Sequence, residues 1–302
     1  MSFAEVNHKF HNRANAAIRN ALLAVLLLAS LGGIALADDA KMPPCSSPMA
    51  LALVDRPGTG RTTTTGGSPC VVPAGEVVIE GGVRRQVTTG PNNGIALSSG
   101  PLTFARAGVS KHLELGIAPP GPQSRATRGV AAVSAAQGVT DIVIAAKYQL
   151  LNFDYAQASL GAGYAPPTGT GGFSAGAPTY SLTANLGLTL SSKLSLAVSN
   201  VFGTAVGGDA SGLNRPYFIF APSYTLGYAF DGATTLLAQE ALTSRQGPVL
   251  PAGNRAFVAL QHQLGGRIAL DVDYELNLAP ELGSRSRAVG FGFVWIAVPG
   301  KP

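Results

Sequence analysis

Three acidic side chains alternate with apolar ones in the segment Ile268–Leu276. Asp271, Asp273 and Glu275 occupy the odd positions, and apolar or aromatic residues occupy the even positions. Successive side chains of a β-strand point to opposite faces, so the pattern predicts a strand with one acidic and one apolar face. Such carboxylates could hold calcium, but a straight strand lacks the wrapped loop that calcium sites use. We therefore interpret the ladder as the lining of a polar interior.

The same alternation places charges of both signs on the inner face of other predicted strands. The lining candidates are Arg84, Arg106, Glu114, Asp141, Lys147, Arg267, Asp271, Asp273, Glu275 and Arg287. Two interpretations stay open. The charges form a hydrated path whose field acts on small polar or amphipathic solutes, or they pair across a narrow lumen and close it.

The turn before the acidic ladder sets its expected partners. A three-residue turn, Leu264–Gly266, keeps the apolar faces of both neighbouring strands on the same side. This pairing puts Gln263 beside Arg267 and Arg255 opposite Glu275. It leaves Asp271 and Asp273 without a basic partner on that strand, so a conducting lumen would favour cations there.

Alternation of this kind recurs along most of the chain. Strands are expected near 75–87, 98–108, 111–118, 140–150, 155–166, 179–190, 194–203, 215–230, 234–243, 254–264, 267–277 and 286–298. Short turns and long loops alternate between them, and the segment 119–139 is expected to be one of the long loops. This is the pattern of an all-β, antiparallel outer-membrane barrel of about twelve strands. A soluble β-sandwich with an apolar core is the alternative fold.

The N-terminus has the features of a signal peptide. Lys9, Arg13 and Arg19 precede the apolar run Ala21–Leu36, and Ala35–Ala37 offers small residues for cleavage. We expect residues 1–37 to be removed, since the apolar run is short for a membrane helix. A retained membrane helix is the alternative. Export places the mature chain in the cell envelope, and the predicted barrel places it in the outer membrane of a Gram-negative bacterium.

The only two cysteines, Cys45 and Cys70, both precede the first expected strand. In an oxidising compartment they most simply form one disulfide. Metal binding would need more ligands than these cysteines and the two distant histidines His112 and His262 supply. Residues 38–72 are rich in Gly, Thr, Pro and Ser, which predicts an irregular segment. It could plug the barrel mouth or form a disordered periplasmic leader, and we favour the leader.

Composition fits a barrel whose outer face meets lipid. Charged residues make up 12% of the chain, glycine occurs 38 times, and the mean hydropathy is +0.24. Removing the three basic residues and one acidic residue of 1–37 lowers the formal net charge from +5 to +3, which predicts no nucleic-acid partner. Outward aromatic residues predict girdles at the membrane interfaces: Phe218, Phe220, Tyr224, Tyr228, Phe230, Phe291, Phe293 and Trp295.

Signals for enzymatic chemistry are weak. A G-x-S-x-G spacing occurs at Gly172–Gly176, but it falls in an expected long loop and not at the strand-to-helix turn that a nucleophile elbow needs. A barrel-type lipase would need an outward Ser–His pair near the external leaflet, whereas His262 lies beside a short periplasmic hairpin. We therefore expect no enzymatic activity and no cofactor.

Several short blocks resemble one family. They are Asp55–Pro57, Val72–Gly82, Arg106–Leu115, Asp141–Leu151 and Tyr164–Gly169, the last being similar to an L-P-T-G block. In these blocks the chain looks like the transporter-like outer-membrane barrels named for the meta-pathway of phenol degradation. One departure is that the chain continues past Trp295 to Pro302 instead of ending in an aromatic residue. The resemblance implies transport of small compounds, aromatic ones among the candidates.

The expected organisation is a signal peptide at 1–37, the irregular segment at 38–72, the barrel at 73–298 and a short tail at 299–302. The expected function is a channel or transporter for small solutes, with aromatic and hydrophobic compounds as candidates. Its expected partners are outer-membrane lipid, the solute and the barrel-assembly machinery. The alternative is a non-conducting structural or adhesion barrel that displays its long loops.

Overall fold

A computed structural model describes residues 45–51, 68–90, 94–129, 133–208, 211, 213–245, 253–278 and 285–299. The predicted signal peptide, at 1–37, lies outside these residues. Within the described part of the chain, no helix is both long enough and apolar enough to cross a membrane. One short helix, α2 (Pro48–Leu51), precedes the strands.

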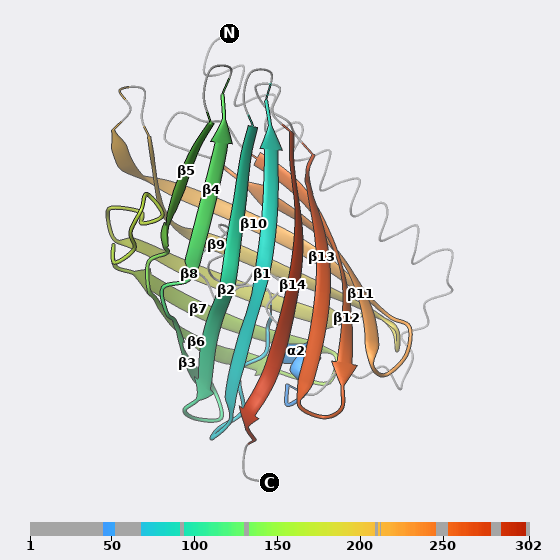
Figure 1. Ribbon diagram of the computed structural model, residues 1–302. Coiled ribbons are helices and arrows are strands. Elements are labelled where there is room, and N and C mark those ends of the chain that lie inside the picture. Colours follow the sequence, from blue (N-terminus) through green and yellow to red (C-terminus); the bar gives the residue numbers. More distant parts are fainter. Residues whose placement is uncertain are drawn as a thin grey trace, which may run out of the picture.

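The described residues form fourteen strands of one antiparallel sheet that closes on itself (Figure 1). They are β1 (Val77–Thr89), β2 (Gly94–Gly108), β3 (Leu113–Ala118), β4 (Pro122–Arg128), β5 (Val133–Val139), β6 (Val143–Asn152), β7 (Ala156–Ala165), β8 (Thr179–Thr189), β9 (Leu194–Gly208), β10 (Asn214–Ala229), β11 (Thr234–Thr243), β12 (Gly253–Leu264), β13 (Ile268–Asn277) and β14 (Arg285–Val298). Pairing of β1 with both β14 and β2 completes the ring.

At two positions around the barrel, one full-length strand is replaced by two shorter segments, β3 with β4 and β6 with β5. The upper half of β2 pairs with β4 through Gly94–Ser99, and its lower half pairs with β3 through Ala105–Gly108. Likewise β5 pairs with β4 above, while β6 pairs with β3 below. When each of these two pairs of segments is counted as one strand, the fourteen segments make twelve strands around the barrel. The prediction of a closed twelve-stranded antiparallel barrel is therefore confirmed.

The expected long loop at 119–139 is wrong, because β4 and β5 occupy most of it. Both strands are made largely of small and polar residues that are exposed, so neither has an apolar face for alternation to reveal. On its far side β5 continues into hydrogen bonding with a loop, through Thr170 N–H donating to the Val139 carbonyl at 2.9 Å.

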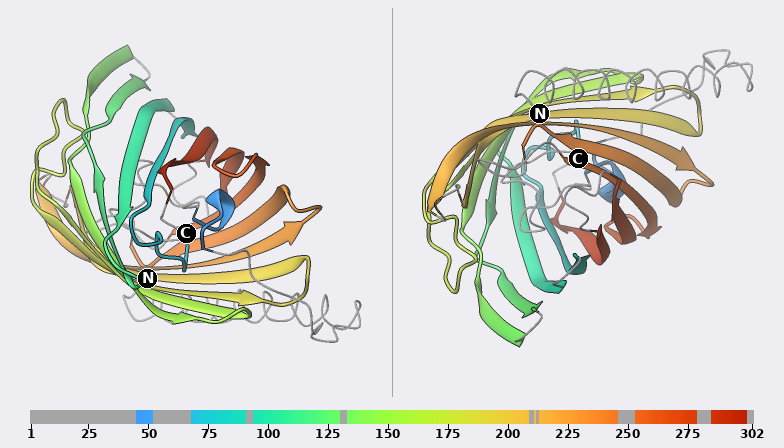
Figure 2. Two further views of the ribbon diagram at one scale, coloured as in Figure 1. Left: turned by 90° about the horizontal axis from the view of Figure 1, so that it is seen from below. Right: turned by 90° about the horizontal axis from the view of Figure 1, so that it is seen from above.

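Alternation explains why these segments form a barrel wall. Along β8, Tyr180, Leu182 and Leu186 point outward with 38–63% of their surface exposed, while the polar residues between them are buried inside. A water-soluble sheet would hide the apolar face instead. Viewed along the barrel axis, the strands surround a central space that contains α2 (Figure 2).

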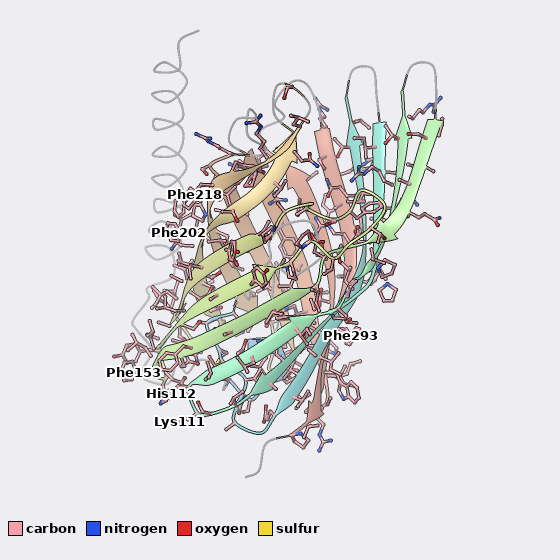
Figure 3. All side chains as sticks on the ribbon, turned by 90° about the vertical axis from the view of Figure 1, so that its left-hand side faces the viewer. Lys111, His112, Phe153, Phe202, Phe218 and Phe293 are labelled. Carbon is pink, nitrogen blue, oxygen red and sulfur yellow. A yellow bond between two sulfur atoms is a disulfide. The ribbon has the colours of Figure 1, made fainter. Side chains whose placement is uncertain are left out.

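Aromatic side chains project from the outer surface towards both ends of the barrel. Phe153 lies near the lower end and Phe218 nearer the upper end (Figure 3). Rings on neighbouring strands pair, with centroids 4.8 Å apart for Phe202 and Phe220. Such rings are typical of the two interfaces of a membrane.

Short turns close the lower end, which is at the bottom of Figure 1. In the β10–β11 turn the Asp231 carboxylate accepts hydrogen bonds from the N–H groups of Ala233 and Thr234, at 2.8 and 2.7 Å. These bonds favour the ionised carboxylate and hold the pKa of Asp231 below its usual value.

The β12–β13 turn differs from the expected one. Leu264 pairs with Ile268, so the turn is Gly265–Arg267 and the register shifts by two residues from the prediction. Gly265 has a φ of 69°, a conformation that glycine adopts without steric penalty. The outward face of each strand is unchanged, because a shift by two preserves alternation.

Candidate functional site

The described parts of the N-terminal segment lie inside the lower end of the barrel. Leu51 and Val72 are fully buried against Val78, Val294 and Ile296 of β1 and β14. A disulfide joins Cys45 to Cys70 and so ties α2 to the extended residues that precede β1. We call residues 45–51 and 68–75 the plug. Their placement differs from the favoured periplasmic leader and corresponds to the plug alternative.

The plug approaches the barrel wall most closely at Gly108. Gly75 N–H donates to the Gly108 carbonyl at 2.8 Å, and Gly108 N–H donates to Glu76 at 3.0 Å. A Cβ added at Gly108 would lie 2.0 Å from the Pro73 carbonyl oxygen. Only glycine therefore fits at this contact.

Four buried charges stand behind the plug, one each on β1, β2, β3 and β6. The Arg106 guanidinium forms an ion pair with Glu80 and another with Glu114, the latter at 3.3 Å. Lys147 Nζ lies 3.3 Å from the same Glu114 carboxylate. All four side chains are almost completely buried. Two positive and two negative groups thus form a neutral cluster, which we call the tetrad.

The tetrad holds the plug by its main chain. Glu114 accepts a hydrogen bond from Val72 N–H at 2.7 Å. Lys147 donates to the carbonyls of Cys70 and Ser68, at 2.7 and 3.3 Å. Arg106 donates to the carbonyl of Leu51. Charge-assisted bonds from buried groups are strong, so the plug is anchored to this side of the wall.

Gln149 and Gln157 extend this anchor. Gln149 accepts from Val71 N–H at 3.0 Å and donates to the Pro69 carbonyl at 3.2 Å. The Gln157 side-chain oxygen lies 3.3 Å from Cys70 Sγ. Both glutamines are buried on the inner face of β6 and β7.

The acidic ladder belongs to a second ion-pair cluster. Arg84 on β1 reaches across β14 to Glu275 at 2.6 Å and to Asp273 at 3.7 Å. Arg255 adds a weaker contact to Glu275 at 3.7 Å, although the residue opposite Glu275 on β12 is Phe257. Asp273 was expected to have no basic partner on the neighbouring strand β12, where it lies opposite Ala259, and it instead forms an ion pair with Arg84 of β1. Its partner comes from two strands away, where turn geometry gives no information.

Asp271 and Asp141, two further predicted lining residues, have different surroundings. Asp271 is half-buried and faces inward opposite Gln261. Asp141 precedes β6 and accepts from Gly169 N–H, Ser174 Oγ and Ala175 N–H, each at 2.7 Å, so it organises the loop between β7 and β8.

Two lining predictions are wrong. Arg267 is exposed in the β12–β13 turn, because the turn lies one residue further on than expected. Arg287 is exposed on the outer face of β14, in phase with the outward Val289, Phe291 and Trp295. It lies near the upper end of that strand, where a long side chain can reach water beyond the lipid.

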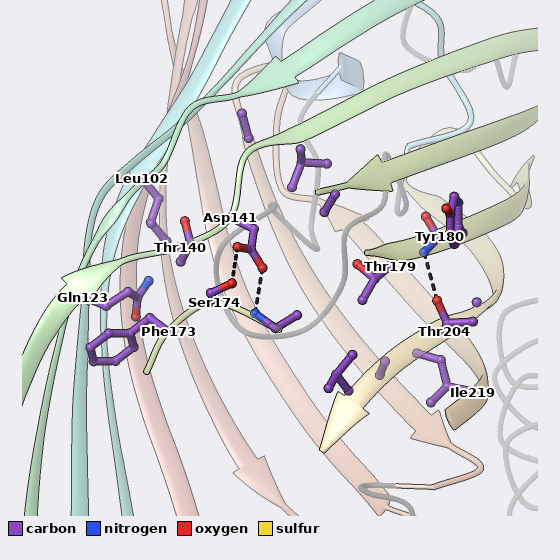
Figure 4. Close-up of a pocket in the computed structure, with 18 of the residues that line it drawn as sticks. Leu102, Gln123, Thr140, Asp141, Phe173, Ser174, Thr179, Tyr180, Thr204 and Ile219 are labelled. Atoms are coloured by element: carbon purple, nitrogen blue, oxygen red, sulfur yellow. Dashed lines mark hydrogen bonds between the residues drawn. The ribbon is translucent and has the colours of Figure 1, made fainter. Parts of the chain in front are cut away.

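The described residues line an upper and a lower cavity in the barrel interior. The upper cavity has a volume of about 480 Å³ and is bordered by β2–β4, by β6–β10 and by the loop that Asp141 organises (Figure 4). Much of its lining is apolar: Leu97, Leu102, Ala118, Val143, Phe173, Val201 and Ile219. The lower cavity, about 810 Å³, separates the plug from the inner face of β8–β12.

Sequence reasoning missed the hydroxyl residues that line the uncharged half of this interior. The inward residues of β7–β10 include Ser159, Thr183, Asn185, Ser199, Ser223 and Thr225, all buried. Asn185 donates to Ser159 at 3.3 Å and accepts from Ser199 at 2.8 Å. Hydroxyl and amide residues at alternate positions could have revealed this wall, but charged residues drew the attention. Among the described residues, no group of three or more His, Cys, Asp or Glu side chains could hold a metal ion.

No family model and no curated protein sequence matches this chain. Solved structures do match it. The COG4313 outer membrane channel from Pseudomonas putida F1 is 15% identical, with 74% of this chain and 96% of the channel covered and a TM-score of 0.57. The NanC porin is 12% identical over 72% of this chain and 98% of the porin, with a TM-score of 0.48. The CymD monoaromatic hydrocarbon channel is 9% identical over 74% and 89%, with a TM-score of 0.41. At these identities the likeness shows the fold alone: an outer-membrane β-barrel of the porin-like kind.

Proposed function

We propose that the protein is a passive outer-membrane channel for small solutes and that it prefers uncharged aromatic or hydrophobic compounds. The upper cavity is the observation that carries this proposal. Its volume of about 480 Å³ lies in the range of small-molecule sites, and its lining combines apolar side chains with hydroxyl and amide groups and with the charged Arg125 and Asp141. Transfer of an apolar solute from water into such a space is favourable in free energy, because its apolar surface is removed from water.

The location follows from the outer face. Large apolar and aromatic side chains are exposed on nearly every strand, which suits contact with outer-membrane lipid. Removal of residues 1–37 and insertion by the barrel-assembly machinery complete this proposal. The buried ion pairs of the described interior are assigned a structural role in this proposal. The proposal includes no enzymatic step.

Current recording in planar bilayers tests the proposed function. The mature chain should give stepwise conductance, and the neutral probe benzyl alcohol should interrupt the current as it occupies the upper cavity. Val201→Trp fills that cavity from the inner face of β9 and should remove most of the interruptions. Leu182→Trp, on the outer face of β8, is the matched control and should behave as the unchanged protein. Interruptions that persist in Val201→Trp would contradict the site.

The anchored plug favours a second candidate, a non-conducting barrel that displays its upper loops. Hydrogen bonds between the plug main chain and Glu114, Lys147 and Arg106 hold the plug in its seat, and a seated plug narrows the lower end. The same recordings decide between the candidates. A correctly folded barrel that remains silent would support the structural role.

A further inference from the structure

Charge is unevenly distributed around the inner wall. The tetrad lies on β1–β3 and β6. The second ion-pair cluster, which we call the Arg84 cluster, consists of Arg84, Asp273, Glu275 and Arg255 and lies on β1, β12 and β13. On the described strands β7–β11, the only charged residue that the strand register places inward is Arg215, near the upper end. One half of the wall is therefore ionic and the other half is neutral.

The plug lies against the ionic half. Its main-chain bonds go to Glu114, Lys147 and Arg106, and Leu51 packs against β1 and β14. The lower cavity is the space that this one-sided seating leaves open. Ser47, Met49 and Pro69 of the plug form one side of it, and the inner face of β8–β12 forms the other.

The lower cavity extends to the end of the barrel. It reaches the β8–β9 turn at Ser192 and Lys193 and the β10–β11 turn at Asp231 and Gly232. Above these turns its wall presents hydroxyl and amide groups between small residues: Gln157, Gly187, Thr189, Ser195, Ala197, Thr225, Gly227, Thr235, Gln261 and Gln263. Opposite charges therefore occur only at its rim, on Lys193 and Asp231.

We propose that solutes leave the barrel through this space while the plug remains seated, and we call it the neutral passage. The inference rests on the proposed channel function. It also narrows the solute to a small uncharged molecule with an apolar body and at least one hydroxyl or amide group. The apolar part suits the upper cavity, and the polar group can exchange hydrogen bonds along the hydroxyl and amide wall. Away from the rim, this wall offers an ion no opposite charge, so it favours neither cations nor anions.

Both cavities border the same strands, β8–β10, which gives the route a consistent side. Between them the strand register places Asn185, Ser199 and Ser223, again uncharged. Release of the plug is unnecessary on this route. It would require breaking the main-chain bonds to the buried tetrad, whereas passage beside the plug leaves these bonds intact.

A single introduced thiol tests the passage. Both native cysteines are in the disulfide, so Ser195→Cys adds the only free thiol. Ser195 is half-buried and lines the lower cavity. A negatively charged methanethiosulfonate reagent, added from the lower side in planar bilayers, should reduce conductance roughly twofold or more by placing a bulky charge in the path.

Lys111→Cys is the matched control, because Lys111 is exposed in a different turn at the same end of the barrel, outside the cavity lining. Its labelling should leave conductance unchanged, and mass spectrometry establishes complete labelling of both variants. Normal conductance in fully labelled Ser195→Cys protein would overturn the neutral passage and leave the channel function intact. A silent unlabelled protein would instead overturn the channel function and the passage together.

Discussion

Arg106 is the central side chain of the tetrad. It contacts two carboxylates, Glu80 and Glu114, and also the plug carbonyl of Leu51. Burial of such a group is favourable only when its charge is fully compensated by close partners. The stability of the lower barrel therefore depends on the tetrad remaining complete, because removing one member leaves the others with an unbalanced charge.

Replacement of this arginine by a neutral side chain should be strongly destabilising. Arg106→Gln leaves two carboxylates facing one lysine, and we expect a loss of about 3–5 kcal/mol in the free energy of unfolding. A guanidinium titration of the refolded barrel in lipid vesicles measures this change. Arg85→Gln, at an exposed position on β1, should change stability little. Equal losses for both variants would contradict the structural role of the tetrad.

Alternation predicted the face of most charged residues but not their partners. It placed Glu114, Lys147 and Asp273 inward, as the structure has them. The link from Arg84 to Glu275 spans β14, so it depends on two registers and on barrel closure. A register error of two residues at one turn leaves each side chain on its predicted face of the sheet, but it changes the residue that lies opposite on the neighbouring strand. Pairing therefore could not be derived from the sequence pattern.

At the scale of elements, apolar alternation marks the strands that face lipid. It identified β8, whose outward leucines are separated by buried polar residues. It missed β4 and β5, whose exposed small and polar residues give no difference between faces. These two strands lie in the upper half of the barrel. Their place is set by the pairing of β4 with β2 and of β5 with β4, and the first of these is a non-local contact that periodicity does not report.

A charge on the outward face of β8 should be costly. Leu186 lies near the middle of this strand with 38% of its surface exposed. Leu186→Arg should lower the unfolding free energy by roughly 2–4 kcal/mol if the face meets hydrocarbon. Thr189→Arg, which points into the roomy lower cavity, is the comparison and should cost much less. A folding titration in vesicles that gives equal losses would refute the lipid-facing assignment.

The disulfide links the two described parts of the plug. Replacing Cys45 and Cys70 together by serine removes a constraint worth about 3 kcal/mol for a loop of this size. The barrel strands do not depend on that link, so heat-modifiability on gels should stay unchanged. Open-channel current noise should rise, because α2 is then held mainly by Leu51 and its bond to Arg106. Reductant should have no further effect on the double variant, and quiet currents from it would show that the disulfide does not steady the plug.

At the scale of the whole molecule, the lower lumen separates its charges from its open space. The ion pairs bind the plug and join strands on one side, and the lower cavity follows the uncharged strands on the other, while the upper cavity borders both sides and has Arg125 and Asp141 in its lining. This arrangement accounts for a barrel rich in buried charge and still suited to neutral solutes. It also predicts weak ion selectivity, since each cluster contains as many positive as negative groups.

Ion selectivity should appear when one of the two clusters no longer has equal numbers of positive and negative groups. Arg84→Met leaves the carboxylates of Asp273 and Glu275 without their shared partner, so the lumen gains negative potential on that side. In a salt gradient the reversal potential should move towards cation preference, whereas Arg85→Met, on the exposed face of β1, should leave it unchanged. Heat-modifiability of both variants establishes that they are folded before recording. A folded, conducting Arg84→Met channel with an unaltered reversal potential would mean that permeating ions do not sense the ionic wall, and that the neutral side carries the current at a distance from these charges.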